Sequence, residues 1–266
     1  MTNNKGVRVI QSIQRAIDII NCFSESELSL SINEISEKLS LHVNTTRGII
    51  NTLVYNGFLR YDPVENKYSL GLIFIPKAKL VSLNSVDDIR NIVRPYLTKL
   101  ANDYQVSARL QLISQHNNIF TVDTVNPEYT RYMVMTKPYT EFPLNATSSG
   151  KLYLYYSGKE QIEKYLQNLN ADNHIKYTEK TILSREGLEK ELDFIEKNGY
   201  SIEDEEINIG ISSIAVPVFN KDDKFIGTIS VTATSGIIRK IQDKVVIDMK
   251  KASREIKDKF NIDYNI

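Results

Sequence analysis

One segment of the 266-residue chain has residue types that could bind phosphate: Ser148-Ser149-Gly150-Lys151 ends in the glycine–lysine pair of a phosphate-binding loop. Such a loop also requires a second glycine five residues earlier and a serine or threonine after the lysine. Asn145 and Leu152 occupy these two positions. The sequence therefore does not predict nucleotide chemistry here.

Other catalytic or metal-binding arrangements are equally weak. The histidines His42, His116 and His174 lie in three separate segments, so neither a metal triad nor a Ser-His pair is indicated. The acidic run 203–206 could bind a cation, but solvated charge is the commoner explanation of such a run. The single cysteine, Cys22, excludes an internal disulfide and a cysteine-rich metal site. We predict no catalytic residue, no metal and no cofactor.

The segment 43–55 points to a different chemistry, the reading of DNA. At 100° per residue, one side of a helix would carry Thr46, Ile49, Ile50 and Leu53, and the other Asn44, Arg47, Gly48, Asn51 and Tyr55. The second side is polar and has no carboxylate that DNA phosphates would repel. An ordinary surface helix could show the same division, so the neighbouring elements must decide.

Those elements form a helix-turn-helix pattern. A first helix is expected over 12–23, with an apolar core stripe made of Ile13, Ala16, Ile17, Ile20 and Phe23. Ser31 and Glu34 have the spacing of a capping box, which starts a second helix. Only Ser40–His42 separates it from the third helix, which ends at Asn56-Gly57.

A β-hairpin is expected directly after the third helix, with strands 58–61 and 67–70 around the turn 62–66. This is the arrangement of a winged helix. On this prediction Asn44, Thr45, Arg47 and Asn51 face the major groove, while Arg60 and Lys67 contact phosphates.

The charge distribution supports a local rather than a global DNA-binding surface. The chain has 33 basic and 33 acidic residues, so its net charge gives no sign of nucleic-acid binding. From Ser40 to Arg60, however, the only charged side chains are Arg47 and Arg60. A local basic surface is therefore compatible with a neutral total.

Membrane insertion and export are not predicted. No stretch approaches the roughly 18 apolar residues that span a bilayer, and the run 70–75 stops at Pro76. The first residues lack the apolar centre of a signal peptide. With 41% apolar and 25% charged residues, the composition is that of a globular protein, which we expect in the cytoplasm without membrane contact.

The rest of the chain is predicted as a helical linker, 72–93, and a C-terminal domain, 94–266. The apolar residues Leu72, Ile73, Phe74 and Ile75 exceed what one helix needs and predict a two-fold interface. Pro95 is interpreted as the first residue of a separate helix that runs to about Asp103. Beyond it we expect hairpins 106–114/119–125 and 214–219/225–233, a strand 132–135, and helices 149–156, 159–168, 186–198 and 238–260. This is an α+β pattern with an antiparallel sheet.

At this point nearly the whole chain resembles the IclR family of bacterial transcriptional regulators. The N-terminal similarity lies in residues 12–20, 30–36, 51–53, 57–59 and 68–71. The C-terminal similarity lies in Pro143–Lys151, which resembles the family's Pro-Leu-His-Ala-Thr-Ala-x-Gly-Lys segment, and in residues 199–206, 210, 215–219 and 229–231. The resemblance implies a winged helix-turn-helix domain over 1–71, joined by a helix to a GAF-like effector domain, in a homodimer or a dimer of dimers.

The resemblance also implies a small-molecule pocket. Its positions are Ser148, Ser149, Glu203, Ser213, Ser230 and Thr232. We add Met133 and Leu144 as expected apolar walls. Backbone amides at a helix N-terminus together with hydroxyl groups suit a carboxylate or another oxyanion. Without the resemblance, Ser230 and Thr232 would be ordinary polar strand positions.

Three positions depart from the family pattern. Gly48 stands where the family commonly has arginine, while Arg47 is one place earlier, so the operator sequence is not predictable. Asn145 replaces a common histidine. Glu203 replaces a common aspartate; ionised it would repel an anion, whereas protonated it could donate a hydrogen bond.

We therefore predict a ligand-responsive, DNA-binding transcription regulator without catalysis, whose partners are double-stranded operator DNA and a small organic acid or polar metabolite. The alternative is a metabolite-binding module or small-molecule enzyme whose winged helix contacts other proteins.

Overall fold

The computed structural model describes residues 9–24, 26–81, 87–113, 119–129, 143–169 and 174–259. The chain divides into two compact units, residues 1–84 and 85–266. The N-terminal unit contains α1 (Gln11–Ile20), α2 (Ile32–Lys38), α3 (Val43–Tyr55), β1 (Leu59–Asp62), β2 (Lys67–Leu70) and α4 (Phe74–Val81). The predicted boundaries 1–71, 72–93 and 94–266 remain predictions.

A small apolar core holds the N-terminal unit together. Ile19 of α1, Ile35 of α2 and Ile50 of α3 are fully buried in it. The predicted capping box starts α2, because the Ser31 hydroxyl accepts from the Glu34 N–H and the Glu34 carboxylate accepts from the Ser31 N–H. Each bond pairs a backbone donor that the first turn of a helix would otherwise leave unsatisfied.

The predicted apolar stripe of α1 is wrong in part. Ile13 and Ile17 are 54% and 45% exposed, whereas Ile19, which lies outside the stripe, is fully buried. Within this unit α1 packs against α3, and one neighbouring helix covers only part of an apolar surface. The buried side of α1 is therefore rotated towards Ile19.

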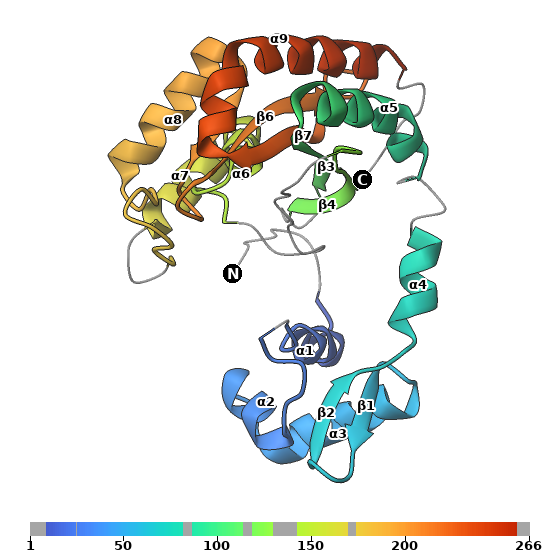
Figure 1. The fold of residues 1–266 in the computed structure, drawn as a ribbon. Helices are drawn as coiled ribbons and strands as arrows, with labels where there is room; N and C mark the ends of the chain where they lie inside the picture. Colours follow the sequence, from blue (N-terminus) through green and yellow to red (C-terminus); the bar gives the residue numbers. More distant parts are fainter. Residues whose placement is uncertain are drawn as a thin grey trace. The chain divides into compact units, whose positions relative to one another are not determined.

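The C-terminal unit is built on a five-stranded antiparallel sheet of order β4-β3-β7-β6-β5. Its strands are β3 (Ser107–Ile113), β4 (Ile119–Val125), β5 (Ser201–Asp204), β6 (Ile211–Phe219) and β7 (Phe225–Thr234), and its helices are α5 (Asp87–Tyr104), α6 (Ser148–Tyr156), α7 (Lys159–Asn168), α8 (Arg185–Asn198) and α9 (Ser235–Lys259). Helices α5 and α9 lie side by side on one face, and α6 packs on β6 and β7 (Figure 1). The predicted α+β class with an antiparallel sheet is confirmed.

Two predictions about the path of the chain are corrected. Pro95 lies inside α5 and does not begin a helix. Ile89, Val93 and Leu97 are all fully buried on the sheet side, so the packing extends across the proline and keeps the helix continuous, although Pro95 has no N–H to donate. The first two residues of the acidic run 203–206, which was interpreted as solvated charge, belong to the edge strand β5 (Ser201–Asp204). The predicted strand 132–135 and the hairpin tip 116–118 lie outside the described residues.

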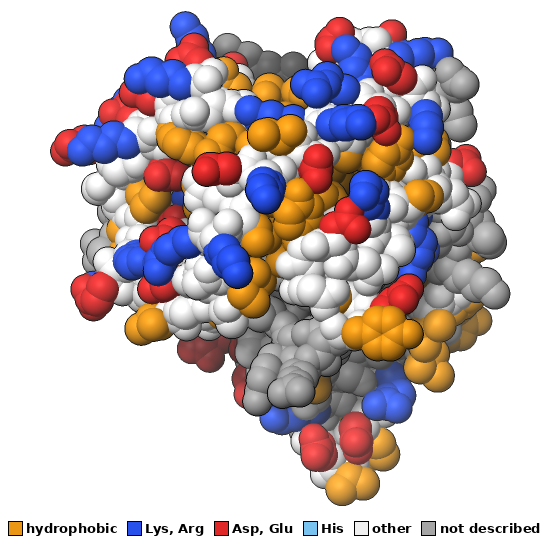
Figure 2. Space-filling model, turned by 45° about the horizontal axis from the view of Figure 1, so that its top comes forward, with side chains coloured by type: hydrophobic (Ala, Val, Ile, Leu, Met, Phe, Trp, Pro, Cys, Tyr) orange, Lys and Arg blue, Asp and Glu red, His pale blue; other side chains and the backbone are white. Residues whose placement is uncertain are grey.

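On the face drawn in Figure 2, lysine and arginine side chains are intermixed with acidic ones, so this face gives little sign of a charged ligand. Many pair within one helix, as Lys99 with Asp103, Lys190 with Glu186 and Lys251 with Glu255. In the part of the chain that the structure describes, no helix is long and apolar enough to cross a lipid bilayer.

Candidate nucleic-acid interface and candidate effector site

The turn between α2 and α3 fixes how α3 is presented. Ser40 adopts a left-handed backbone with φ 52°, and the Leu41 N–H bonds the carbonyl of Ser36 at 2.9 Å. The His42 ring nitrogen Nδ1 then accepts from the Asn44 N–H at 3.3 Å and caps α3. Helix α3 therefore begins at Val43 and ends at Tyr55, as the sequence predicts.

The two sides of α3 are divided as expected. Thr46, Ile50 and Leu53 are buried, while all four predicted groove residues, Asn44, Thr45, Arg47 and Asn51, are exposed. Gly48 lies among them, and a β-carbon added there would meet nothing within 4 Å. The exposed side of α3 has one positive charge, Arg47, and no acidic residue.

The wing places its two basic residues on one face. In the β1–β2 register Arg60 is opposite Ser69 and Lys67 is opposite Asp62, so Arg60 and Lys67 share a face because side chains alternate along a strand. Arg60 is exposed and Lys67 is half-buried. Asp62 and the nearby Glu65 offset this charge, so the wing is less basic than its two cations alone imply.

A second site is built on the face of the C-terminal sheet opposite α5 and α9. Alternate residues of β7 divide between the two faces: Ile229, Val231 and Ala233 join the apolar core, whereas Thr228, Ser230 and Thr232 face the other way. The Thr228 hydroxyl donates to the Ser149 hydroxyl of α6 at 2.9 Å. This polar face therefore lies under the N-terminus of α6.

Helix α6 approaches the sheet closely at this end. The Thr147 hydroxyl accepts from the Gly150 N–H at 3.0 Å and caps the helix. A β-carbon at Gly150 would lie 2.6 Å from the Leu144 Cα, so only glycine permits the contact between α6 and the preceding turn. Gly150 thus serves packing here.

Three of the transferred pocket residues, Ser148, Ser213 and Glu203, are joined in one hydrogen-bonded chain. The hydroxyl groups of Ser148 and Ser213 are 2.8 Å apart, and the Ser213 hydroxyl donates to Glu203 Oε2 at 3.2 Å. Ser213 and Thr232 are register partners on β6 and β7. Six predicted residues, Ser148, Ser149, Glu203, Ser213, Ser230 and Thr232, are buried on or beside the polar face.

Two further residues of this face escaped the sequence analysis. Arg109 on β3 is 5% exposed and donates to the Thr232 hydroxyl at 2.8 Å. Gln111, two residues on, donates to Ser230 at 3.0 Å and accepts from Thr228 at 3.1 Å. Burial lowers the pKa of Arg109 to about 10, which leaves it charged at neutral pH. Polar residues at alternate positions of an apolar strand were the available signal.

Glu203 has an unusual environment. It is 5% exposed, and its Oε1 accepts from the backbone N–H groups of Glu206 and Ile207 at 2.9 and 3.3 Å. Burial raises the pKa of Glu203 to about 7, although these backbone bonds and Ser213 oppose the rise. The interpretation of run 203–206 as solvated charge is therefore wrong for Glu203 and Glu206, which are both buried.

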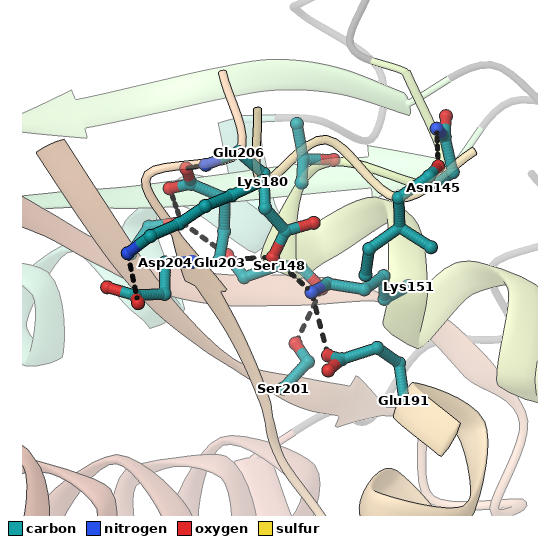
Figure 3. A network of polar contacts seen from close by, with 12 residues as sticks. Asn145, Ser148, Lys151, Lys180, Glu191, Ser201, Glu203, Asp204 and Glu206 are labelled. Atoms are coloured by element: carbon teal, nitrogen blue, oxygen red, sulfur yellow. Dashed lines mark hydrogen bonds and ion pairs between the residues drawn. The ribbon is translucent and has the colours of Figure 1, made fainter. Parts of the chain in front are cut away.

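A buried ion-pair network lies beside the same turn (Figure 3). Lys151 is fully buried, and its Nζ lies 2.7 Å from both Glu191 Oε2 of α8 and Glu206 Oε1. Burial raises the pKa of Glu206, and the Lys151 charge opposes that rise. The network ties α6 to α8 and to the turn after β5.

Of the two predicted apolar walls, only Leu144 lies within the described residues. Leu144 lines a different cavity of about 310 Å³ between α6 and α7, whose walls include Tyr153, Tyr165 and His174. Met133 lies outside the described residues. Among the residues that the structure describes, no group of three or more histidine, cysteine or acidic side chains could hold a metal ion.

A winged helix-turn-helix unit followed by a five-stranded sheet domain defines the class of this protein. Residues 12–63 match the model of the IclR helix-turn-helix domain, and residues 81–258 match that of the bacterial transcriptional regulator IclR C-terminal domain. The chain belongs to the IclR family, and it is a DNA-binding transcription regulator of that type, not an enzyme.

Relatives and solved structures agree with this assignment. The HTH-type transcriptional regulator XynR of Escherichia coli is 26% identical over 230 residues, which cover 86% of this chain and 88% of XynR. An IclR family regulator from Brucella abortus has a TM-score of 0.82 at 20% identity, covering 97% of this chain and 95% of its own. An IclR homologue from Microbacterium hydrocarbonoxydans, complexed with 4-hydroxybenzoate, has a TM-score of 0.68 at 18% identity, covering 93% and 98%.

Proposed function

We propose that this regulator responds to a small organic acid or polar metabolite bound on the polar face of the C-terminal sheet. The observation that carries the proposal is the buried polar face itself, which gathers Arg109, Gln111 and several hydroxyl groups and whose β5–β7 part is covered by α6. Cationic, amide and hydroxyl donors suit an oxyanion. Because the proposed partner is operator DNA, we expect this activity in the cytoplasm.

The solved homologue that binds 4-hydroxybenzoate supports the acid class of ligand, because it has the same fold. Binding regulates only if it differs between the states that bind DNA well and poorly. A tenfold change in operator affinity needs about 1.4 kcal/mol of coupling.

For DNA recognition we propose that α3 enters the major groove with Asn44, Thr45, Arg47 and Asn51 towards the bases. Arg60 and Lys67 of the wing then contact phosphates. All four α3 residues are exposed on one side of the helix, whose other side is buried in the core. This division supports the assignment.

The exposed apolar residues of the N-terminal unit support a homodimer or a dimer of dimers. Leu72 and Ile75 are 73% and 67% exposed, and Ile13 and Ile17 of α1 are also exposed. Apolar surface of this kind, on a unit with so small a core, favours association. We propose that residues 72–75 contribute to the two-fold interface.

Selection of bound fragments from the host's genomic DNA tests the regulator and its symmetry together. We expect enrichment of a short palindrome whose half-sites lie about one or more turns of DNA apart. A single unrepeated half-site would contradict the two-fold arrangement. A failure to enrich any DNA would favour the alternative, in which the winged helix contacts proteins.

Replacing Gly48 by alanine should separate stability from DNA recognition. Alanine stabilises a helix interior by about 0.5–1 kcal/mol relative to glycine, and the added methyl group meets no protein atom. Hydrogen exchange of α3 should therefore slow by about two- to fivefold. Operator affinity should fall, because the methyl group lies at the centre of the exposed side. Unchanged or higher operator affinity would show that DNA does not approach Gly48.

Substitutions on the polar face should weaken the response to an acid. The acid used is the carboxylate that stabilises the protein most in a thermal-shift panel that includes 4-hydroxybenzoate. We expect Ser148→Leu and Ser230→Ala to reduce the change in operator affinity that this acid causes. Ser157→Ala, at the far end of α6, is the matched control. Operator binding without the acid is measured for every variant, which separates a lost response from a lost fold. Wild-type acid affinity in both variants, measured by titration calorimetry, would place the pocket elsewhere.

A further inference from the structure

Glu203 is a buried carboxyl group in the part of the polar face nearest the N-terminus of α6. Its Oε2 lies 3.2 Å from the Ser213 hydroxyl, which is itself 2.8 Å from the Ser148 hydroxyl. Within the described part of the chain, no lysine or arginine forms an ion pair with Glu203. The next three residues along the chain, Asp204, Glu205 and Glu206, are also acidic.

The other charged groups around Glu203 have partners of their own. They are Lys151 of α6 with Glu191 of α8 and Glu206; Lys180 and Arg239 with Asp204 and Glu205; and Arg109 of β3, hydrogen-bonded to Thr232. Strands β3 and β5 are three strand spacings apart, about 14 Å. Arg109 and Glu203 therefore lie on the same face of the sheet but on distant strands. A charged Glu203 would therefore add a second buried negative charge beside Glu206.

The hydrogen bonds of Glu203 distinguish its two oxygens. Oε1 accepts from two backbone N–H groups, so it must act as the acceptor. A neutral carboxyl group then carries its proton on Oε2, which faces the hydroxyl groups of Ser213 and Ser148. The geometry thus suits an acid whose O–H points into the cluster.

The raised pKa of about 7 means that both forms of Glu203 are populated near neutral pH. An anion brought close to Glu203 disfavours its charged form further, since like charges repel most strongly in a buried site. Protonation removes this repulsion and supplies a donor. Anion binding and proton uptake should therefore be coupled.

Resting on the proposed function, we propose that the effector is a carboxylate anion that binds beside the neutral form of Glu203, so that binding takes up a solvent proton on Oε2. The affinity should then fall by up to roughly tenfold per pH unit above about pH 7. Below about pH 6 it should be nearly constant, because Glu203 already carries the proton.

The protonation of Glu203 is tested first in the ligand-free protein. Carbon-13 NMR of the side-chain carboxyl groups, with Glu203→Gln to assign the signal, should give a Glu203 titration midpoint near 7. A midpoint below about 5, the range of an ordinary glutamate, would overturn the proposal.

The ligand is tested with a thermal-shift panel of small aliphatic and aromatic carboxylates, including 4-hydroxybenzoate, beside neutral polyols. We expect carboxylates to stabilise the wild-type protein more at about pH 6 than at about pH 8, each compared with the ligand-free protein at the same pH. In Glu203→Gln, which keeps the shape without the exchangeable proton, this pH difference should disappear. Equal shifts at both pH values, stabilisation by polyols alone, or no carboxylate shift at either pH would each overturn the proposal.

Genomic DNA selection by the wild-type protein distinguishes a failure of the proposed regulation from a failure of proton uptake by Glu203. Enriched DNA together with binding that is independent of pH would leave the regulator intact and reject the role of Glu203. No enriched DNA would reject the proposed regulation, while the NMR and thermal-shift results would still decide whether Glu203 takes up a proton.

Discussion

Lys151→Met should lower the free energy of unfolding of the C-terminal unit by about 3–5 kcal/mol, the cost of leaving a buried charge without its partner. Lys151 is fully buried, and Glu206, its partner at 2.7 Å, is 5% exposed. Methionine preserves the length and apolar stem of lysine, so the lost charge and hydrogen bonds dominate the effect. Urea denaturation followed by circular dichroism measures it.

Two variants test the cause. Lys151→Met with Glu206→Gln removes both charges of the buried pair and should recover much of the lost stability. Lys190→Met breaks an exposed pair with Glu186 on α8 and should change stability little, since water screens both groups. A change in Lys151→Met no larger than in Lys190→Met would show that the buried network contributes nothing.

Arg47→Ala should weaken binding to the best genomic site by about 1–3 kcal/mol, which is roughly five- to 150-fold, if Arg47 pairs with a guanine. It is the cation on the exposed side of α3. The preference should relax at one base pair of each half-site. Fluorescence anisotropy with the selected site and single-base variants measures both effects.

Lys67→Ala is the matched comparison, because it also removes one positive charge. A phosphate contact should weaken all sequences alike and reduce the slope of affinity against salt by about one counterion. Asp62, opposite Lys67 across the wing, should make the loss smaller than for a lone lysine. Binding unchanged in both variants would reject the assigned DNA surface.

Much of the local structure follows from the sequence alone. The bounds of α3 and α7 were predicted to the residue, and the capping box at Ser31 and the wing hairpin were also predicted. Caps, stops and periodic apolar residues act within a few positions of the chain, so short-range patterns determine them. Short motifs in both halves of the chain, among them 12–20 and 143–151, indicated the family.

The environments of individual side chains were predicted less well from the sequence, because they depend on which helices and strands cover a surface. The α1 periodicity was visible, but only packing on α3 selected Ile19 over Ile13 and Ile17 for burial. From the sequence, Pro95 indicated the start of a helix. In the structure the helix continues through it, because the burial of residues on both sides outweighs one missing hydrogen bond.

The candidate effector site shows the same division most clearly. The family pattern indicated Ser148, Glu203 and Ser230, whereas Arg109 and Gln111 look like the solvent side of an alternating strand. Gln111 meets Ser230 across 119 positions, and Lys151 meets Glu206 across 55. Local propensity contains no information about such pairs, since a strand has the same pattern whether its polar face meets water or a helix. Only tertiary packing removed the water from this face, and that burial altered the proton affinities of Glu203 and Arg109.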